Sequence, residues 1–534
     1  MMRERIPSSN RPRWLGAAVA LTTAALLAVG LSGSAQAAKK PPATTFSDIV
    51  PAPVSAVAAT GVSYTIGSSA TVSSDVPNIG SYLAGILRAS TGYPIPVNAG
   101  STTGSISLLL SGAPATVGTQ GYQLTIAATG IVIRANQPAG LFAGVQTLLQ
   151  VLPPSVQSPT KQPGPWTAPG GTVVDYPRFA YRGAMLDVAR HFFTVAQVEQ
   201  YIDEIALYKI NYLHLHLSDD QGWRIAINGW PQLTTIGGST EVGGGAGGYY
   251  TQADYQAIVA YAQSRYITVI PEIDMPGHTN AALASYAELN CDGVAPPLYT
   301  GTDVGFSSLC TSLPITYTFL TDVIDQLAAL TPGQYIDIGG DEATSTTAAD
   351  YTAFEQKVQA IVAATGKTAI GWDPNLSTAP LLPSTVAQFW DTTTTDSTLA
   401  AAAANGTKII MSPANHDYLD MKYTKNTTLG QNWAGYTDVE KAYGWDPGAY
   451  LSGVSASAIL GVEAPLWSET LVTSADIQYM AFPRLPAIAE LGWSPESTHN
   501  WTAFDTRLGA QGPRWKFMGI NYYHSTQVTW PTGS

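Results

Sequence analysis

A pattern of strand and helix is clearest in residues 184–220, which read AMLDVARHFFTVAQVEQYIDEIALYKINYLHLHLSDD. The apolar runs at 184–188 and 212–217 predict two strands. Between them, Thr194 and Gln197 have the spacing of a capping box, which predicts the start of a helix. A strand, a helix and a second strand in this order predict parallel strands in an α/β fold. The expected helix has one apolar face, formed by Val198, Tyr201, Ile202 and Ile205.

The same alternation continues to about residue 490. Eight strands that alternate with helices predict a (β/α)8 TIM barrel. A doubly wound open sheet is the alternative, but no Gly-rich dinucleotide or phosphate loop follows any expected strand. The further strands are expected at 267–273, 335–339, 368–372, 386–390, 408–412 and 459–464, with helices at 252–265 and 475–490 among those between and after them.

The residues before the barrel have a different pattern. Short β-rich runs alternate with Gly and Ser turns and two helical stretches, which predicts a small α+β domain. The runs lie at 62–66, 106–110, 122–126 and 131–134, and the helices at 79–90 and 140–152. The expected organisation is a signal peptide at 1–38, an N-terminal α+β domain at 48–153, a linker rich in Pro and Gly at 154–175, a catalytic barrel at 176–510 and a C-terminal extension at 511–534 packed on the barrel.

The N-terminus predicts export. Four arginines in the first 13 residues precede an apolar run at 15–31 and the small residues Ala-Gln-Ala at 35–37. These are the features of a cleavable signal peptide, and an uncleaved membrane anchor is the alternative. No later stretch is long and apolar enough to span a bilayer. We therefore expect a secreted, extracellular protein that has no membrane segment after cleavage.

Charge and cysteine content limit the partners further. The net charge of −13 makes nucleic acid an unexpected partner, because phosphate backbones repel an acidic protein. The two cysteines, Cys291 and Cys310, lie in one loop-like segment. In an exported protein they are expected to form a disulfide.

The expected strands end in side chains suited to a polar ligand, and barrel active sites lie at that end of the strands. Carboxylates and Arg make bidentate hydrogen bonds to hydroxyl groups, while Trp rings stack on the apolar faces of sugars. A metal site is the weaker alternative, because the His and carboxylate residues lack a tight ligand spacing. No metal or other cofactor is expected. The side chains are Asp187, Arg190, His191, His216, Asp219, Trp223, Glu272, Asp274, His278, Asp341, Glu342, Trp372, Trp390, Tyr418, Asp420, Trp467 and Glu469.

The adjacent pair Asp341 and Glu342 is the strongest candidate for catalysis. Glycoside cleavage needs a protonated acid at the leaving oxygen and a group that stabilises an oxocarbenium-like carbon. If one carboxylate stays ionised, its charge raises the pKa of the other, which suits a general acid. Gly339 and Gly340 precede the pair and leave room for a ligand to approach the backbone.

Several motifs together resemble glycoside hydrolase family 20, the β-N-acetylhexosaminidases. They occur in the family's order over most of residues 175–495, and GLFAGVQTL at 140–148 resembles part of the family's small N-terminal domain. The barrel motifs are RGAMLDVARHFF at 182–193, LHLHLSDDQGWR at 213–224, PEIDMPGH at 271–278, GGDE at 339–342, WAGY at 433–436 and WSE at 467–469.

The resemblance implies an exo-acting, retaining enzyme whose substrate supplies its own nucleophile, the 2-acetamido oxygen. It would remove terminal non-reducing β-linked N-acetylglucosamine or N-acetylgalactosamine from glycans or chito-oligosaccharides, through an oxazolinium intermediate. Glu342 would protonate the leaving oxygen and later activate water. Asp341 would hold the acetamido N–H, and Tyr418 would bind the acetamido oxygen.

The resemblance also implies a set of substrate-binding residues. Arg190 would bind the 3- and 4-hydroxyls, with Asp420 and Glu469 on the side of the 4- and 6-hydroxyls. Asp219 and His278 would support Arg190 and the acid/base. The walls around the sugar would be Trp372, Trp390 and Trp467, and Trp433 would be an aromatic lid or aglycone platform.

One position departs from the family pattern. The family usually has His or Asn three residues before the Gly-Asp-Glu tripeptide, where this chain has Asp337. Strand alternation places Asp337 on the same face as Asp341, so it is expected to need a hydrogen-bond partner or a raised pKa. Two alternatives to the implied function remain at this stage: a relative that releases a disaccharide, and a glycan-binding protein without catalysis.

Overall fold

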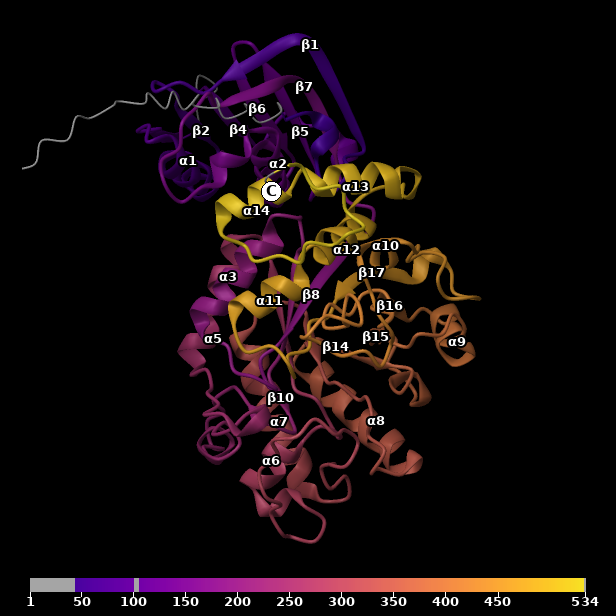
Figure 1. The fold of residues 1–534 in the computed structure, drawn as a ribbon. Coiled ribbons are helices and arrows are strands. Elements are labelled where there is room, and N and C mark those ends of the chain that lie inside the picture. Colours follow the sequence, from indigo (N-terminus) through magenta and orange to yellow (C-terminus); the bar gives the residue numbers. More distant parts are fainter. Residues whose placement is uncertain (1–43, 100–104, 533–534) are drawn as a thin grey trace, which may run out of the picture. The chain divides into compact units, whose positions relative to one another are not determined.

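The computed structural model describes residues 44–99 and 105–532. The signal peptide expected at 1–38 lies outside these residues. Within them, the chain forms an N-terminal domain built on one sheet, followed by a closed barrel (Figure 1). Among the described helices, none has the length and apolar character needed to cross a bilayer.

The N-terminal domain is the expected α+β domain. Its sheet has the order β1-β7-β5-β6-β4-β2-β3 and contains both parallel and antiparallel pairs. Helices α1 (Pro77–Thr91) and α2 (Pro138–Val151) agree with the two predicted helices, and α2 packs on β5 and β6. The strands are β1 (Ser55–Thr65), β2 (Val72–Ser74), β3 (Val97–Ala99), β4 (Ile106–Leu109), β5 (Tyr122–Ala127), β6 (Gly130–Ala135) and β7 (Thr167–Asp175).

The linker predicted at 154–175 is wrong over its second half. Residues 167–175 form β7, which pairs antiparallel with both β1 and β5. The sequence Pro169-Gly-Gly171 hid this strand, since such residues are typical of turns. Glycine is needed at 171 because a Cβ there would lie 2.3 Å from the carbonyl oxygen of Val57 on β1.

The barrel is confirmed, and the open-sheet alternative is wrong. Eight parallel strands close in the order β12-β13-β14-β15-β16-β17-β8-β9. All eight agree with predicted strands to within three residues at each end. They are β8 (Tyr181–Asp187), β9 (Tyr212–His216), β12 (Thr268–Glu272), β13 (Tyr335–Asp337), β14 (Thr368–Asp373), β15 (Val386–Phe389), β16 (Lys408–Met411) and β17 (Ile459–Ala464).

Helices surround the barrel, and one predicted helix is divided. The helix expected at 475–490 is observed as α11 (Ser474–Ala481) and α12 (Arg484–Trp493). Phe482, which precedes Pro483, has extended backbone angles, because a proline disfavours the helical conformation of the residue before it. The other longer helices are α3 (Val195–Ala206), α5 (Gln252–Ser264), α7 (Pro314–Leu330), α8 (Ala348–Ala364) and α9 (Ser397–Ala404).

The interior of the barrel is layered. The lowest layer is apolar and includes Tyr181 and Tyr335, the first residues of their strands. Above it lies a polar layer that includes His214, Glu463 and Gln388, all fully buried. The upper layer is aromatic and apolar and consists of Met185, Trp372, Ala414, Tyr418, Met421 and Trp467. The polar layer therefore lies directly beneath the end of the barrel where the predicted site residues are found.

The C-terminal segment lies against both domains. Figure 1 shows α13 (Trp501–Gly509) and α14 (Gly512–Met518) between the N-terminal domain and the barrel. Arg514 donates hydrogen bonds to the carbonyl oxygens of Leu149, Gln150 and Leu152 in the N-terminal domain. On the barrel side, Trp515 Nε1 donates to Tyr208 Oη at 2.7 Å. The segment therefore packs on the barrel, as expected, and on the N-terminal domain as well.

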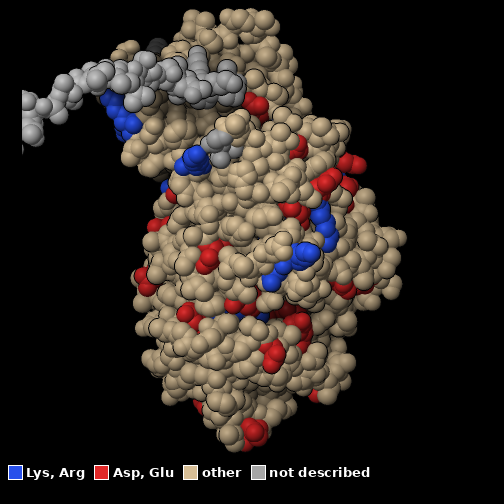
Figure 2. Space-filling view, viewed as in Figure 1, with Lys and Arg blue, Asp and Glu red and all other residues tan. Residues whose placement is uncertain are grey.

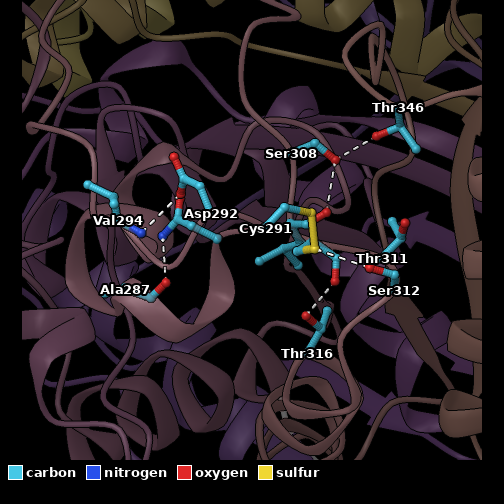
Figure 3. Close-up of a disulfide and its surroundings, with 12 residues drawn as sticks. Ala287, Cys291, Asp292, Val294, Ser308, Thr311, Ser312, Thr316 and Thr346 are labelled. Carbon is cyan, nitrogen blue, oxygen red and sulfur yellow. Dashed lines mark hydrogen bonds between the residues drawn. A yellow bond between two sulfur atoms is a disulfide. The ribbon is translucent and has the colours of Figure 1, made fainter.

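The predicted disulfide is confirmed. Cys291 and Cys310 are joined, with their Cα atoms 5.0 Å apart (Figure 3). Hydroxyl groups surround the bridge: Thr316 Oγ1 donates to the carbonyl oxygen of Cys310 at 2.8 Å, and Ser312 Oγ lies 3.4 Å from its sulfur. The two cysteines are 19 residues apart in the sequence, and by the chain-entropy model a disulfide that closes such a loop contributes about 3 kcal/mol to stability.

Candidate active site

The Asp341–Glu342 pair lies in a turn directly after β13, at the C-terminal end of the barrel. Three residues of this turn have left-handed backbone angles: φ is +67° at Gly339, +97° at Gly340 and +46° at Glu342. A Cβ on Gly339 would lie 1.9 Å from Oδ1 of Asp274. The two glycines are therefore required for the conformation that presents the two carboxylates.

Hydrogen bonds to three side chains, two acceptors and one donor, hold this turn. Oδ1 of Asp337 accepts from the backbone N–H of Gly339 at 2.9 Å, and Oδ1 of Asp274 accepts from that of Gly340 at 3.1 Å. Tyr351 Oη donates to the carbonyl oxygen of Gly340 at 2.8 Å. All three side chains are buried, so the turn has a fixed shape.

A chain of charged groups runs from Glu342 to Arg190. His278 Nε2 lies 3.3 Å from Oε2 of Glu342 and 3.7 Å from Oδ2 of Asp341. The other ring nitrogen of His278 lies 3.3 Å from Oδ1 of Asp219, whose Oδ2 is 2.8 Å from NH2 of Arg190. Burial lowers the pKa of His278, but the carboxylates around it, Asp219 above all, raise it by more, so the ring is cationic at neutral pH.

Asp274 and Asp341 are neighbouring carboxyl groups, and their oxygens and a ring nitrogen of His278 lie within 4.8 Å of one another. Burial is the largest cause that raises the pKa of both, and the charge of Asp341 raises that of Asp274 further. The cationic His278 lowers the pKa of both, but the pKa of Asp274 still lies well above its usual range, and the interaction with Asp274 lowers the pKa of Asp341. Asp274 therefore keeps its proton, and Asp341 is the member of the pair that carries negative charge.

A second network lies beneath the first and links it to the aromatic wall. His216 Nε2 bonds Oδ2 of Asp219 at 2.8 Å, and its Nδ1 bonds Oε2 of Glu272 at 2.5 Å. Oε1 of Glu272 accepts from Trp372 Nε1 at 2.8 Å. Burial raises the pKa of Glu272, but the cationic His216 and His214 lower it by more, so Glu272 is ionised. Burial lowers the pKa of His216, yet the two carboxylates raise it to about 9.

The predicted aromatic residues form one connected wall. The ring of Trp467 lies 5.7 Å from Trp372 and 6.1 Å from Tyr418, and the guanidinium of Arg190 lies 4.8 Å above it. Trp433 contacts both Tyr418 and Trp390 at 5.9 Å between ring centres. Trp433 is 56% exposed, whereas the other aromatic side chains are buried or half-buried. Burial and the charge of Asp341 raise the pKa of Tyr418, which therefore stays a hydrogen-bond donor.

Arg190 is held rigidly. Its backbone N–H donates to Oδ1 of Asp187 at 3.0 Å, and Oδ2 of Asp187 is 3.5 Å from its NH1.

Asp420 and Glu469 are two further carboxyl groups near Arg190, and burial raises the pKa of both. The charge of Glu469 raises the pKa of Asp420 further, whereas Arg190 lowers the pKa of Glu469. Oδ1 of Asp420 is buried without a hydrogen-bond partner among the described residues. It is available to a polar ligand.

Groups of His, Asp and Glu atoms close enough to hold a cation also occur here. The group of His214, Glu272 and Asp337 is fully buried, and its ligand atoms lie within 4.8 Å of one another. In the structure, His214 Nε2 and His216 Nδ1 both lie against Oε2 of Glu272, at 2.9 and 2.5 Å. The shared carboxylate oxygen thus has two histidine neighbours.

The structure brings the predicted site residues together at one end of the barrel, with contacts that connect them. Sequence reasoning named Glu272, His216 and Asp274 as strand-end residues but left them out of the site. The register of neighbouring strands could have identified two of them. It places four residues side by side: Asp187, His216, Glu272 and Asp337. Tyr351 was missed entirely, because a tyrosine on an amphipathic helix has no distinguishing pattern. Figure 2 shows acidic side chains spread over the face in view, in agreement with the net charge.

A closed parallel barrel with paired carboxyl groups and a wall of tryptophans at the C-terminal ends of its strands defines a carbohydrate-active barrel enzyme. Comparison with known proteins gives the family. The profile described as "Glycosyl hydrolase family 20, catalytic domain" matches residues 179–496, and "Glycosyl hydrolase family 20, domain 2" matches residues 47–176. The chain belongs to glycosyl hydrolase family 20 and is a glycosidase. The resemblance stated from the motifs is confirmed.

Relatives cover nearly the whole chain. A β-N-acetylhexosaminidase of Cellulomonas fimi is 40% identical over 456 residues, which are 85% of this chain and 90% of the relative. The structure of the family 20 β-N-acetylhexosaminidase of Streptomyces coelicolor A3(2) has a TM-score of 0.89 and 55% identity, covering 91% of this chain and 99% of that one. A mutant Streptomyces plicatus β-hexosaminidase, solved with its product GlcNAc, has a TM-score of 0.89 and 56% identity and covers 91% and 98%.

Proposed function

We propose that this glycosidase is an exo-acting, retaining β-N-acetylhexosaminidase that removes terminal β-linked N-acetylglucosamine or N-acetylgalactosamine from glycans or chito-oligosaccharides. The observation that carries the proposal is the Asp341–Glu342 turn beside the cationic His278, facing Tyr418 and the tryptophan wall. The product complex of the Streptomyces plicatus enzyme supports N-acetylglucosamine as the sugar.

In the first step, the acetamido oxygen of the substrate attacks its own anomeric carbon as the bond to the leaving oxygen breaks. Glu342 gives its proton to that oxygen, so the leaving group departs as an alcohol. The sugar becomes a bicyclic oxazolinium. The anionic Asp341 accepts the N–H and stabilises the positive charge, and Tyr418 donates to the acetamido oxygen.

In the second step, water attacks the anomeric carbon from the side that the leaving group occupied. The Glu342 carboxylate takes a proton from this water, and the oxazoline ring opens to restore the acetamide. Two inversions at one carbon give a product with the β configuration. His278, 3.3 Å from Glu342, supplies a fixed positive charge throughout the cycle.

The exo character rests on the groups around Arg190. The guanidinium is buried and held by Asp187 and Asp219, so its geometry is fixed before substrate binds. Asp420 and Glu469 supply carboxyl oxygens for hydroxyl groups at the same edge. Fixed donors and acceptors of this kind would bind the hydroxyls at the non-reducing end of the sugar and leave the chain no path past them.

A panel of reducing-end-labelled chito-oligosaccharides and chromogenic N-acetylglucosaminides and N-acetylgalactosaminides tests the proposal. We expect the labelled chain to shorten by one sugar at a time. Release of disaccharides would indicate the disaccharide-releasing alternative, and binding without turnover would indicate a glycan-binding protein. The ratio of the two chromogenic rates would give the epimer preference.

The leader at 1–38 supports a second proposal, that the protein is exported and acts outside the cell. A disulfide between Cys291 and Cys310 agrees with this, because disulfides persist in oxidising compartments. N-terminal sequencing of protein from the culture medium should give a start near residue 38. Protein that stays in the cell with its first residues intact would contradict the proposal.

A further inference from the structure

The last residue of β13, Asp337, supports the turn that carries the two catalytic carboxyl groups. Its side chain is fully buried, and its Oδ1 accepts from the backbone N–H of Gly339 at 2.9 Å. Gly339 has φ +67°, which opens the left-handed part of the turn. Asp341 and Glu342 follow within three residues. The position of both carboxyl groups therefore depends on this hydrogen bond.

The second oxygen of Asp337 lies in the polar layer of the barrel. Oδ2 is 3.7 Å from His214 Nε2 and has no hydrogen-bond partner in the described part of the chain. His214 Nε2 is 2.9 Å from Oε2 of Glu272, and its Nδ1 is 2.8 Å from Oε1 of Glu463. Asp337 and Glu272 are register partners on neighbouring strands. Glu272 in turn holds Trp372, so Asp337 adjoins both the turn and the aromatic wall.

Acidic groups outnumber basic ones around Asp337. Among the described residues, the groups that face it are Glu272 on β12, Glu463 on β17, Glu355 on α8, Tyr181 on β8 and, as the one cation, His214 on β9. Burial and Glu272 raise the pKa of Asp337 to about 8, although His214 and the bond to Gly339 lower it. At neutral pH, Asp337 is therefore mostly the neutral acid, while Glu272 beside it is ionised.

We propose that Asp337 is a positioning residue for catalysis and that it acts as a neutral acid. Its Oδ1 fixes the Gly339 amide, and its Oδ2 lies against the His214–Glu272 pair without adding charge. Ionised Asp337 would place a second negative charge beside Glu272 and repel the carboxylate of Glu272, which holds Trp372. The inference rests on the proposed function, because it concerns the turn that presents Asp341 and Glu342.

Three variants separate the two parts of this role. Asp337→Asn keeps a neutral side chain with an oxygen acceptor for the Gly339 amide, and we expect it to keep kcat within about threefold. Asp337→Leu has a similar size but no acceptor, and we expect kcat to fall about tenfold to a hundredfold with KM nearly unchanged. The matched control is Asp373→Asn on the neighbouring strand β14, a buried carboxyl that bonds Ser377 and lies outside the turn.

The pH dependence gives the readout that a merely structural role would not change. Dividing the kcat of Asp337→Asn by that of the wild type at each pH removes the ionisation of Glu342, which both proteins share. Raising the pH through about 8 removes the proton of Asp337 in the wild type, whereas the variant has none to lose. We therefore expect the ratio to rise above pH 8, and the same ratio for Asp373→Asn to stay flat there.

A spectroscopic measurement tests the protonation state without substrate. The infrared difference between wild type and Asp337→Asn at pH 7 should contain a protonated-carboxyl band that disappears as the pH passes about 8. Absence of this band, a flat kcat ratio, or wild-type kcat in Asp337→Leu would each overturn the inference. If Asp337→Leu does not fold, the band and the ratio decide. Wild-type protein that shows the band but cleaves no hexosaminide would contradict the proposed function instead.

Discussion

In the proposed mechanism, bond cleavage depends on the carboxyl group of Glu342. Its side chain is 36% exposed, so it can reach a leaving oxygen, and His278 Nε2 lies 3.3 Å from one of its oxygens. A leaving group of high pKa needs the proton that this residue donates, whereas an activated aryl group does not.

Glu342→Gln should therefore lose most activity on chito-oligosaccharides and much less on activated aryl glycosides in the first step. On poor leaving groups we expect kcat to fall by about 10²- to 10⁴-fold. Steady-state rates over a series of leaving groups measure how strongly the rate depends on the pKa of the leaving group. Equal losses across the series would mean that Glu342 is not the acid.

Sequence reasoning succeeded best at this scale, and for a physical reason. Residues such as Glu342, His278 and Arg190 lie in short motifs just after strands, and barrel geometry brings strand ends together. The partners of those residues were harder to assign. Asp274 and Glu272 differ from ordinary buried strand residues only in what lies across the barrel, which period and composition do not reveal.

The turn after β13 shows how an element controls the site. Gly339 combines a left-handed φ of +67° with the close approach of Asp274, and either feature alone would disfavour a side chain. Gly366 has φ +80° in the turn before β14, and a Cβ there would meet no described atom within 4 Å.

Gly339→Ala should therefore lower kcat at least about tenfold and reduce stability by more than the roughly 1 kcal/mol expected from φ alone. Gly366→Ala is the matched control, with the cost of φ and without the clash, and its kcat should stay close to that of the wild type. Kinetics and thermal unfolding of the two variants measure both effects. A Gly339→Ala variant as active as Gly366→Ala would show that the turn tolerates displacement.

At the level of elements, regular strands were predictable and irregular ones were not. Barrel strands are buried on both faces and appear as mostly apolar runs, such as 269–271 in β12. Strand β7 contains Pro-Gly-Gly, and β2 and β3 have three residues each, so none has enough alternation to be recognised. The division between α11 and α12 lies at Pro483, which the prediction of one helix over 475–490 did not take into account.

The whole molecule is joined by buried polar groups between its domains. Glu490 on α12 accepts hydrogen bonds from the backbone N–H of Ala52 at 3.0 Å and from Tyr443 Oη at 3.0 Å, and it pairs with Arg507 at 2.5 Å. Residues 44–534 form one compact unit by their contacts. The sequence predicted the two domains but not the interface between them, because a buried interface of this kind has no local signature.

Glu490→Ala should destabilise the protein by about 3–5 kcal/mol, since it leaves a half-buried cation and two donors without their acceptor. Glu496→Ala is the matched control: this carboxylate is 69% exposed and lies 3.9 Å from Arg178, so its removal should cost less than about 1 kcal/mol. Denaturant unfolding followed by tryptophan fluorescence measures both. Equal stability of the two variants would mean that the interface contributes little.

In the proposed mechanism, the acetamide of the substrate is the nucleophile, and fluorination of that acetamide changes its reactivity while the enzyme stays the same. Each fluorine on the acetyl methyl group withdraws electrons from the carbonyl oxygen and makes it a weaker nucleophile. We predict that kcat for aryl N-acetyl-β-glucosaminides falls stepwise from none to three fluorines, while a β-glucoside without the acetamide is essentially inert. Rates independent of fluorine number, or a covalent sugar adduct on Asp341, would contradict the account.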